Sequence, residues 1–378
     1  MNPKYQPLME PYRFKNGTKV KNRVVLAPMT ISYSQLDGTI SDEIIAYYES
    51  RSSGVGIAVT GSTIVTPNSK VFGGEMAADY DDMIPSLQRL AAAMKKSGSK
   101  AILQIFHGGR ESLPESVPNG EVVSASAVAK EGQNVIPRAL EEQEILEIIR
   151  AFGASTRRAI EAGFDGVEIH GANRFLIQQF FSPYTNRRDD RWGGDIDKRM
   201  AFPLAVVDEV KKSVAEHAKR PFLVGYRFSP EEEMTPGITM ADTLQLVDAL
   251  ADKNLDYLHV SLMDFWSKPR RGVEDNRSRM EIINELAGQR IPVIGVGSIR
   301  TPDEALRALQ TGVPFIALGR ELIIDPDWVE KVTQGKENEI RTVITLTDQE
   351  KLGISDPLWH KIVQTPGWFP IASQVKQV

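Results

Sequence analysis

Short apolar runs alternate with longer amphipathic segments along most of the chain. The apolar runs have the length and composition of buried strands. They predict eight strands, at residues 23–29, 55–62, 100–106, 166–170, 222–228, 257–262, 292–297 and 315–319. The amphipathic segments carry polar outer faces at helical spacing. They predict helices at about 41–52, 81–97, 141–162, 198–218, 239–252, 278–288, 302–311 and 326–334.

Several of the predicted helices carry start and stop signals. Ser41 precedes two acidic residues, and Pro302 follows Thr301 at the start of another helix. Both arrangements are typical of helix N-termini. Glycine, which favours the left-handed backbone that ends a helix, follows three of the helix ends, at Gly98, Gly163 and Gly312.

Eight strands that are each followed by a helix predict an α/β fold, a (β/α)8 TIM barrel. An open doubly wound sheet is the alternative, because a strand count does not show closure. No change in composition marks a second domain, so we expect residues 1–378 to form one domain with a barrel core at about 23–335. An N-terminal hairpin that turns at Asn16-Gly17 is expected to close one end of the fold.

Three segments exceed the ordinary connections of such a barrel. Loops 107–140 and 171–197 follow the third and fourth strands, at the end where barrel enzymes carry their active sites. The C-terminal extension 336–378 contains several aromatic side chains, including Trp359, Trp368 and Phe369. These either pack under the barrel or reach a ligand or a second subunit.

Composition and charge narrow the possible partners. The formal net charge is −5, and no run of lysine and arginine forms a basic stripe. Nucleic acid and anionic membranes are therefore not expected as main partners. The absence of cysteine excludes disulfides, thiol nucleophiles and iron–sulfur clusters. No segment resembles a signal peptide or approaches the ~20 apolar residues of a membrane span, so we expect a cytoplasmic protein.

The predicted fourth strand ends in a turn that carries two candidate binding side chains. His170 stands at the end of the strand, and Asn173 follows three residues later. Two neutral side chains that donate N–H bonds at this spacing can converge on one oxygen, such as a ligand carbonyl or phenolate. For the motif in isolation, a core histidine followed by a turn asparagine is the simpler interpretation.

Polar residues inside apolar strands indicate further candidates. Gln104 lies in the third strand and Arg227 in the fifth, and each needs a polar partner if it points into the barrel. An amide suits the pyrimidine edge of a flavin, whereas a guanidinium requires an anion or an electron-rich group. A structural ion pair is the alternative for Arg227. Thr30, after the first strand, either binds a cofactor edge or is an ordinary turn residue.

Glycines and a basic residue follow the last two strands. They include Gly297 with Ser298, and Gly319 with Arg320. Free backbone N–H groups and a positive charge suit a phosphate, which barrels commonly bind after strands seven and eight. A Rossmann fingerprint is not present, because its third glycine is missing. The sequence also lacks a serine-hydrolase elbow and paired zinc-binding histidines, so no metal is expected.

Together these motifs resemble the Old Yellow Enzyme family of FMN-dependent NAD(P)H oxidoreductases over almost the whole chain. The resemblance rests on segments 22–30, 103–110, 226–230, 295–298 and 317–320, and above all on the run 163–202. Because the cysteines of the larger iron–sulfur members are missing, the chain most resembles the short bacterial NADH-dependent flavin oxidoreductases. A single FMN-binding barrel domain is therefore expected.

The resemblance also implies roles for individual residues. His170 and Asn173 would be the catalytic pair that holds the oxygen of an α,β-unsaturated substrate, and NADH or NADPH would supply the electrons. FMN would be bound by Pro28, Met29 and Thr30 along the ring, Gly61 near the same edge as Thr30, and Gln104 at the pyrimidine end. Arg227 would lie by the part of the ring that becomes anionic on reduction, and Gly297, Ser298, Gly319 and Arg320 would hold the phosphate. Family members are often oligomers, so a homo-oligomer is expected.

One position departs from the family pattern. The family places Gly-Tyr after His-x-x-Asn, and that tyrosine delivers the proton that completes alkene reduction, whereas this chain has Arg174-Phe175. Tyr33 and Phe175 would line the substrate site, but phenylalanine donates no proton. Tyr33, Tyr184 or water are the candidate donors in its place.

The expected activity is therefore reduction of FMN by NAD(P)H, followed by reduction of an electron-poor acceptor. An α,β-unsaturated carbonyl, a quinone or a nitro compound would serve as that small-molecule acceptor. Two alternatives remain open: a related FMN dehydrogenase that oxidises an organic substrate, and a flavin-binding regulatory module with weak turnover.

Overall fold

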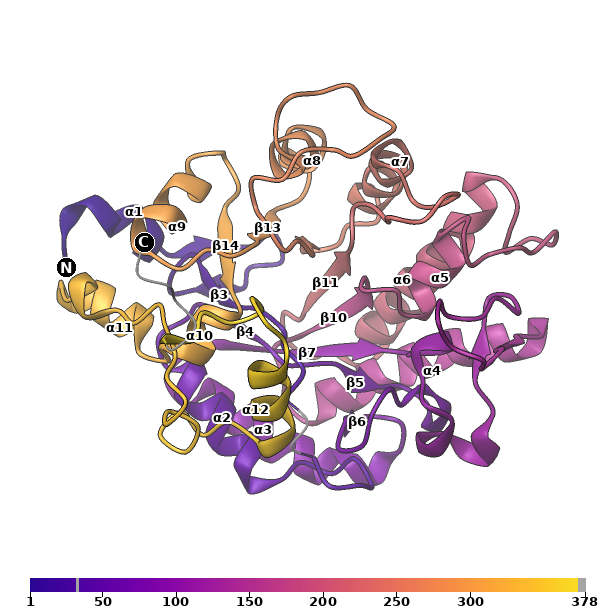
Figure 1. Ribbon diagram of the computed structural model, residues 1–378, viewed down its shortest axis with the longest axis horizontal. Helices are drawn as coiled ribbons and strands as arrows, with labels where there is room; N and C mark the ends of the chain where they lie inside the picture. The colour runs from indigo at the N-terminus through magenta and orange to yellow at the C-terminus, as the bar shows by residue number, and fades with distance from the viewer. Residues whose placement is uncertain (32–33, 373–378) are drawn as a thin grey trace.

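The computed structural model describes residues 1–31 and 34–372. The eight barrel strands are β3 (Val24–Leu26), β4 (Ile57–Val59), β7 (Lys100–Phe106), β10 (Gly166–Gly171), β11 (Leu223–Phe228), β12 (Tyr257–Val260), β13 (Val293–Val296) and β14 (Phe315–Leu318). All are parallel to their neighbours, and β7 pairs with β10 while β14 pairs with β3, so the barrel is closed (Figure 1). The predicted (β/α)8 barrel is confirmed, and the open sheet is wrong.

Two of the strands differ from their predicted bounds. The first strand ends at Leu26, before Pro28, whose ring removes a backbone donor that a continuing strand would need. The second predicted run, 55–62, contains only the three residues of β4. A separate two-residue strand that was not predicted, β5 (Thr63–Ile64), follows it and pairs with β6 (Met76–Ala77) and with the end of β7. The residues after the first strand are therefore free to line the top of the barrel.

Helices surround the barrel at the predicted places (Figure 1). They are α2 (Asp42–Ser52), α3 (Ile84–Lys95), α4 (Glu142–Glu161), α6 (Ile196–His217), α7 (Met240–Ala251), α8 (Arg279–Ala287), α9 (Pro302–Leu309) and α11 (Trp328–Gln334). The hydroxyl of Ser41 accepts a hydrogen bond from the backbone N–H of Ile44 at 3.3 Å, which caps α2 as expected. A short helix that was not predicted, α10 (Arg320–Ile324), directly follows β14.

A hairpin at the N-terminus closes one end of the barrel, as predicted. This is the end at which the barrel strands begin, here called the lower end. Its strands β1 (Tyr12–Arg13) and β2 (Lys19–Val20) are antiparallel, and they follow α1 (Gln6–Met9). Phe14, only 2% exposed, stacks on Phe315 with ring centroids 5.5 Å apart. The hairpin thus fills the lower end of the barrel interior with an aromatic side chain. Single 3-10 turns lie at Pro3–Tyr5, Pro67–Ser69, Asp81–Met83, Gly109–Glu111, Pro114–Ser116, Pro118–Gly120 and Glu337–Glu339.

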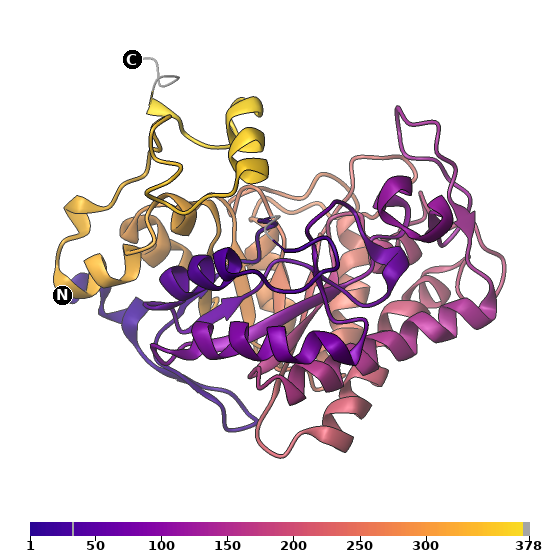
Figure 2. The ribbon, with the colours of Figure 1, turned by 90° about the horizontal axis from the view of Figure 1, so that it is seen from below.

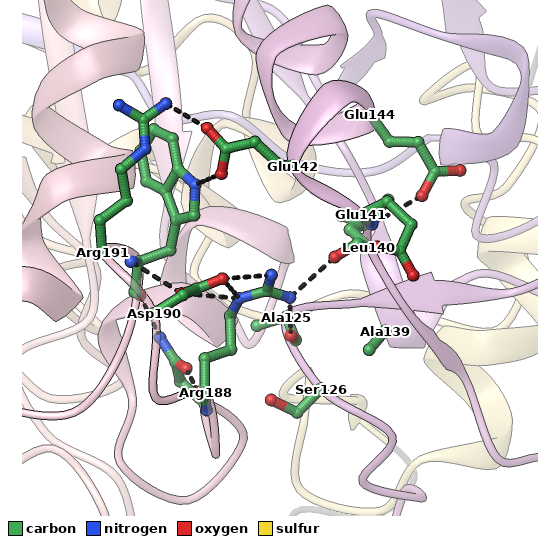
Figure 3. A network of polar contacts seen from close by, with 12 residues as sticks. Ala125, Ser126, Ala139, Leu140, Glu141, Glu142, Glu144, Arg188, Asp190 and Arg191 are labelled. Carbon is green, nitrogen blue, oxygen red and sulfur yellow. Dashed lines mark hydrogen bonds and ion pairs between the residues drawn. The ribbon is translucent and has the colours of Figure 1, made fainter.

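The two long loops after the third and fourth strands are joined to each other. They contain β8 (Val123–Ser124), its partner β9 (Arg138–Ala139), and α5 (Leu176–Phe181). Arg188 donates to the carbonyl oxygens of Ala125 and Leu140, at 2.9 and 2.8 Å, and pairs with Asp190 (Figure 3). One side chain from the second loop therefore anchors the first.

The C-terminal extension lies on the side of the barrel opposite the hairpin (Figure 2). It contains α12 (Asp356–Gln364). Ser355 donates to the carbonyl of Ile31 at 2.7 Å, and Arg51 of α2 donates to the carbonyl of Leu352 at 2.6 Å. The extension thus covers the start of the loop after the first strand, and its aromatic side chains Trp359, Trp368 and Phe369 pack against the hydrophobic core on this side of the barrel. Within the described ranges, no helix is long and apolar enough to cross a membrane.

Candidate active site

A cavity of about 610 Å³ opens at the carboxyl ends of the barrel strands. Much of its wall comes from the ends of β3, β11, β12, β13 and β14. Seven of the predicted site residues line it: Pro28, Met29, Asn173, Arg227, Ser298, Gly319 and Arg320. These residues are far apart in the sequence, and the closed barrel brings them around one space.

The other predicted site residues lie elsewhere. Thr30 and Gly61 share a second cavity of only about 10 Å³, next to Glu75. Gln104 and His170 are 2% and 3% exposed and lie within the barrel interior. Phe175 packs against Phe106 and His170, and Gly297 lies against the backbone of Asp264 and Phe265. Tyr33 falls outside the described residues.

Strand register explains why the buried polar residues meet. Gln104 of β7 lies opposite Glu168 of β10, and His170 lies opposite Arg227 of β11. Arg227 in turn lies opposite His259 of β12. Side chains two residues apart on a strand point to the same side, so Glu168 and His170 both face the barrel interior.

These side chains form one chain of hydrogen bonds. Arg227 donates to Nε2 of His259 at 2.6 Å and to the hydroxyl of Ser261 at 3.2 Å. That hydroxyl donates to Oδ1 of Asn173 at 3.0 Å. On the other side, Nδ1 of His259 lies 2.9 Å from the Glu168 carboxylate, to which Gln104 also donates at 2.7 Å. The interior polar groups therefore connect directly to Asn173 in the cavity.

One donor of this chain lacks a partner. The Nε of Arg227 is buried and has no hydrogen-bond partner among the described residues, although the side chain lines the cavity. An unpaired buried guanidinium N–H is costly unless a ligand accepts from it. Among the described residues, Arg227 bonds to the imidazole of His259 and the hydroxyl of Ser261 rather than to an acidic side chain, so the alternative of a direct structural ion pair is not found. An electron-rich ring or an anion in the cavity would satisfy the unpaired Nε.

His170 is held as a neutral donor. Burial, together with the nearby charge of Arg227, lowers its pKa to about 3. Its Nδ1 accepts a hydrogen bond from the backbone N–H of Ala172 at 3.3 Å, so the proton of the neutral ring resides on Nε2. Phe175 packs edge-on against the imidazole, with ring centroids 4.9 Å apart. The ring orientation is thus set by packing as well as by the hydrogen bond.

The other end of the cavity is suited to a phosphate. Arg320 donates to the hydroxyl of Ser298 and, at 2.7 Å, to the carbonyl of Trp368 in the C-terminal extension. Ser298 has a left-handed backbone, with φ of 52°. A side chain at Gly297 would come within 2.2 Å of the backbone nitrogen of Phe265, so only glycine fits this turn. Backbone, hydroxyl and guanidinium groups thereby converge at one end of the cavity.

Sequence reasoning missed three residues of this site: Glu168, His259 and Ser261. Trp368 was considered only as one of several aromatic side chains that could reach a ligand. The signal that identified Gln104 and Arg227, a polar side chain in an apolar strand, applies equally to Glu168 and His259. Ser261 follows β12 in the loop, where a serine is ordinary, so no local signal marks it.

Of the two tyrosines proposed as replacements for the family tyrosine, Tyr33 lies outside the described residues and Tyr184 does not line the cavity. Tyr184 reaches Glu131 at 3.5 Å in the first long loop and lies beneath the guanidinium of Arg110. None of the described residues that line the large cavity is a tyrosine. The described part of the chain also contains no group of three or more histidine, aspartate or glutamate side chains placed to hold a metal ion.

Comparisons with known proteins agree with this geometry. The model of a family described as the NADH:flavin oxidoreductase / NADH oxidase family matches residues 7–339. The chain is 55% identical over 370 residues to the probable NADH-dependent flavin oxidoreductase YqiG of Bacillus subtilis (strain 168), which covers 98% of this chain and 99% of that protein. It is 41% identical to the NADH:fumarate oxidoreductase of Klebsiella pneumoniae (strain 342), covering 93% of this chain but only 38% of that longer protein.

Among solved structures, morphinone reductase in complex with tetrahydroNAD is similar, with a TM-score of 0.75 and 28% identity over 87% of this chain and 91% of that chain. The resemblance to the Old Yellow Enzyme family is thus confirmed. FMN is the cofactor, a reduced nicotinamide is the reductant, and the enzyme is an NAD(P)H-dependent flavin oxidoreductase. On the match of most of its length, the chain belongs to the NADH:flavin oxidoreductase / NADH oxidase family.

Proposed function

We propose that FMN binds in the 610 Å³ cavity, with its phosphate at Ser298, Gly319 and Arg320 and its ring between Met29 and Arg227. The unpaired Nε of Arg227 supports this placement, because the pyrimidine end of a flavin offers acceptor atoms to it. The convergence of Arg320 and the Ser298 hydroxyl supports the phosphate end. The chemistry of the donor set therefore fits the cofactor.

The whole chain is proposed to act as one FMN-binding unit. Trp368 lines the cavity, and its carbonyl accepts a hydrogen bond from Arg320. The extension thus holds the same guanidinium that faces the phosphate. This contact supports a single domain in which residues 336–372 complete the site rather than forming a separate unit.

The proposed second substrate is an electron-poor acceptor: an α,β-unsaturated carbonyl, a quinone or a nitro compound. The observation that carries this proposal is the state of two side chains. His170 presents an Nε2–H donor, and Oδ1 of Asn173 is occupied by Ser261, which leaves the Asn173 amide N–H groups available. Two neutral donors that are fixed in this way suit an acceptor oxygen that becomes more negative as the acceptor is reduced.

Bound FMN supplies two-electron exchange between a reduced nicotinamide and the acceptor. The protein's own contribution is to polarise the acceptor oxygen with His170 and Asn173. Phe175 lies where it shields the His170 ring and offers no proton. Acceptors whose reduced oxygen or nitrogen takes a proton from water are therefore proposed to turn over faster than simple alkenes, which need a proton on carbon.

A phenol titration of the purified protein tests the donor pair. We expect a yellow protein in which a simple phenol creates a new long-wavelength absorption band, because a phenolate oxygen matches the two donors. In Asn173→Ala the band should require at least roughly tenfold more phenol, since a charge-assisted hydrogen bond is lost. Ser86→Ala is the control and should match the wild type, because the Ser86 hydroxyl of α3 donates to the carbonyl of Met83 at 3.0 Å and does not line the cavity.

Two other outcomes would contradict the proposal. A yellow protein without the band would remove the assigned role of His170 and Asn173 while leaving the FMN site. A protein that is reduced slowly by NADH but rapidly by an amine or alcohol would instead favour the dehydrogenase alternative.

A further inference from the structure

The barrel interior below the cavity contains a buried carboxylate and a buried imidazole to which the function above assigns no role. Glu168 and His259 are both 0% exposed and lie 2.9 Å apart. A buried ion that could be replaced by apolar packing is usually a net cost to stability. The Glu168–His259 pair lies next to Arg227, which lines the cavity, and not at the closed end of the barrel. This position indicates a use other than stability.

Hydrogen-bond chemistry fixes the position of every proton in this cluster. Arginine has only donors, so Nε2 of His259 must accept from Arg227. The single ring proton is therefore on Nδ1, which donates to Glu168. Glu168 in turn accepts from the amide of Gln104 on one oxygen and from His259 on the other, which is the arrangement that suits an ionised carboxylate.

The charges agree with this assignment. Burial, with the charge of Arg227 acting in the same direction, lowers the pKa of His259 to about 4. Burial opposes the ionisation of Glu168, but His259, Arg227 and Gln104 together lower its pKa to about 2. The other titratable side chains that face the cluster are His170, which is neutral, and Tyr257, whose pKa is raised well above its usual value by burial and by Glu168. One negative and one positive charge therefore remain.

We propose that Glu168 and His259 are positioning residues which orient both halves of the active site through opposite branches of one hydrogen-bond chain. The first branch runs from Glu168 to the Gln104 amide. The second runs from His259 through Arg227 and Ser261 to Asn173.

The consequence differs between the two branches. On the first branch, donation to Glu168 turns one N–H of Gln104 away from the ligand and leaves its carbonyl oxygen free to accept from a ring N–H. On the second branch, the same carboxylate holds His259 in the tautomer that accepts from Arg227, and the guanidinium then directs the Ser261 hydroxyl toward Asn173. The functional effect of this cluster rests on the proposed FMN and acceptor roles. The positions of the protons involve protein side chains only, so they can be tested separately.

The first experiment uses the protein without FMN. Nitrogen-15 NMR distinguishes the two imidazole nitrogens, and the chain has only five histidines to assign. We expect His259 of the wild type to be neutral with its proton on Nδ1 from pH 5.5 to pH 8. In Glu168→Gln this single tautomer should be lost, because a side-chain amide faces two N–H donors with one oxygen. A wild-type His259 that carries its proton on Nε2, or both protons at pH 7, would overturn the proposal whatever the protein binds.

The second experiment measures the reduction potential of the FMN-loaded protein. Glu168→Gln removes the negative charge that balances Arg227, so the potential should shift to a more positive value. Glu168→Asp keeps the charge and should lie closer to the wild type. An equal shift in both variants, or no shift in either, would contradict the proposed role.

Two further variants distinguish the proposed positioning role of the two branches from a role in stability alone. Ser261→Ala cuts the branch to Asn173, so phenol affinity should fall by roughly threefold to tenfold while the potential stays near that of the wild type. Asp165→Asn is the matched control, because Asp165 is a buried carboxylate at the opposite end of β10 that accepts from the backbone of Ala101 at 3.0 Å. It should lower thermal stability and leave both the potential and the phenol affinity unchanged. A potential shift as large as that of Glu168→Gln would show that any buried carboxylate has this effect, and would overturn the assignment.

Discussion

The side chain at position 175 packs between two aromatic partners and has no acidic proton. Its ring lies 4.8 Å from that of Phe106 and 4.9 Å from that of His170, in edge-to-face contact with both. The space beside His170 is therefore filled by carbon. At the scale of single residues, the proposed site would polarise an acceptor oxygen through His170 while the neighbouring side chain, Phe175, offers no proton.

Phe175→Tyr should restore proton delivery. The added hydroxyl is expected to raise the rate of alkene reduction in an α,β-unsaturated carbonyl by at least several-fold, because general acid catalysis typically contributes about 10²–10⁴-fold. The rate of FMN reduction by NADH should change little, since that step needs no proton donor. Stopped-flow spectroscopy of the two half-reactions measures both. An increase in both rates, or in neither, would argue against the missing proton donor as the limiting feature.

Glu75 should make the folded chain less stable as the pH rises. Burial raises its pKa from the ordinary 4.5 to about 8. Between these values the folded chain keeps a proton that the unfolded chain has lost, so the stability present below pH 4.5 is progressively lost up to about pH 8. Glu75→Gln, which imitates the protonated form, should be more stable than the wild type at pH 8 by on the order of 2–4 kcal/mol.

Urea denaturation at pH 5 and pH 8 measures this difference. Glu321, whose pKa is also raised to about 8 by burial, is present in both proteins and cancels from the comparison. The two proteins should have similar stability at pH 5. Parallel pH dependence in the two proteins would show that Glu75 is ionised in the folded state.

At the scale of elements, the two long loops depend on Arg188. This side chain is 13% exposed and provides donors for two carbonyls in the first loop and for Asp190 in its own (Figure 3). The loops are not open connections: β8 and β9 pair within the first, and α5 starts the second. Because α5 begins shortly after Asn173, which lines the cavity, the anchoring of these loops also supports the wall of the cavity.

Arg188→Ala should loosen the first loop. Three acceptors lose their donor, and we expect a loss of about 2–4 kcal/mol in the free energy of unfolding together with faster proteolysis within residues 107–140. Arg191→Ala is the matched control. Its side chain is 60% exposed and pairs with Glu142 at the surface, so its loss should cost under about 1 kcal/mol. Equal effects of the two substitutions would contradict the anchoring role.

At the scale of the whole molecule, the two ends of the barrel have separate tasks. The hairpin and Phe14 fill the lower end with apolar side chains, together with Val25, Ile57 and Phe315. The upper end carries the cavity, the polar cluster and the contacts with the C-terminal extension. Such a division lets the binding residues carry unsatisfied polar groups while the opposite end supplies the packing that stabilises the barrel.

Phe14→Ala should therefore lower stability without changing the site. The lost aromatic ring leaves a cavity at the lower end, with an expected cost of about 3–5 kcal/mol. Phe14→Leu keeps most of the volume and should cost less than about 2 kcal/mol. Chemical denaturation and FMN titration of the same variants measure both properties. A loss of FMN affinity in Phe14→Ala at temperatures where the protein remains folded would show that the two ends are coupled.

The sequence by itself determined the elements and most of the candidate residues. Helix caps such as Ser41, glycines after helix ends, and the Asn16-Gly17 turn depend on local backbone chemistry, so they are visible within a few residues. Polar side chains inside apolar strands marked Gln104 and Arg227 for the same reason, since a buried donor needs a partner wherever it lies.

The tertiary structure decided which of these residues meet. Gln104 and Glu168 are 64 positions apart and Glu168 and His259 are 91 apart, and only the closed register of β7, β10, β11 and β12 places them side by side. Likewise, only packing placed the C-terminal extension at the cavity and Tyr184 away from it. Local patterns report whether a side chain is buried, whereas its partner is set by strand pairing across the whole chain.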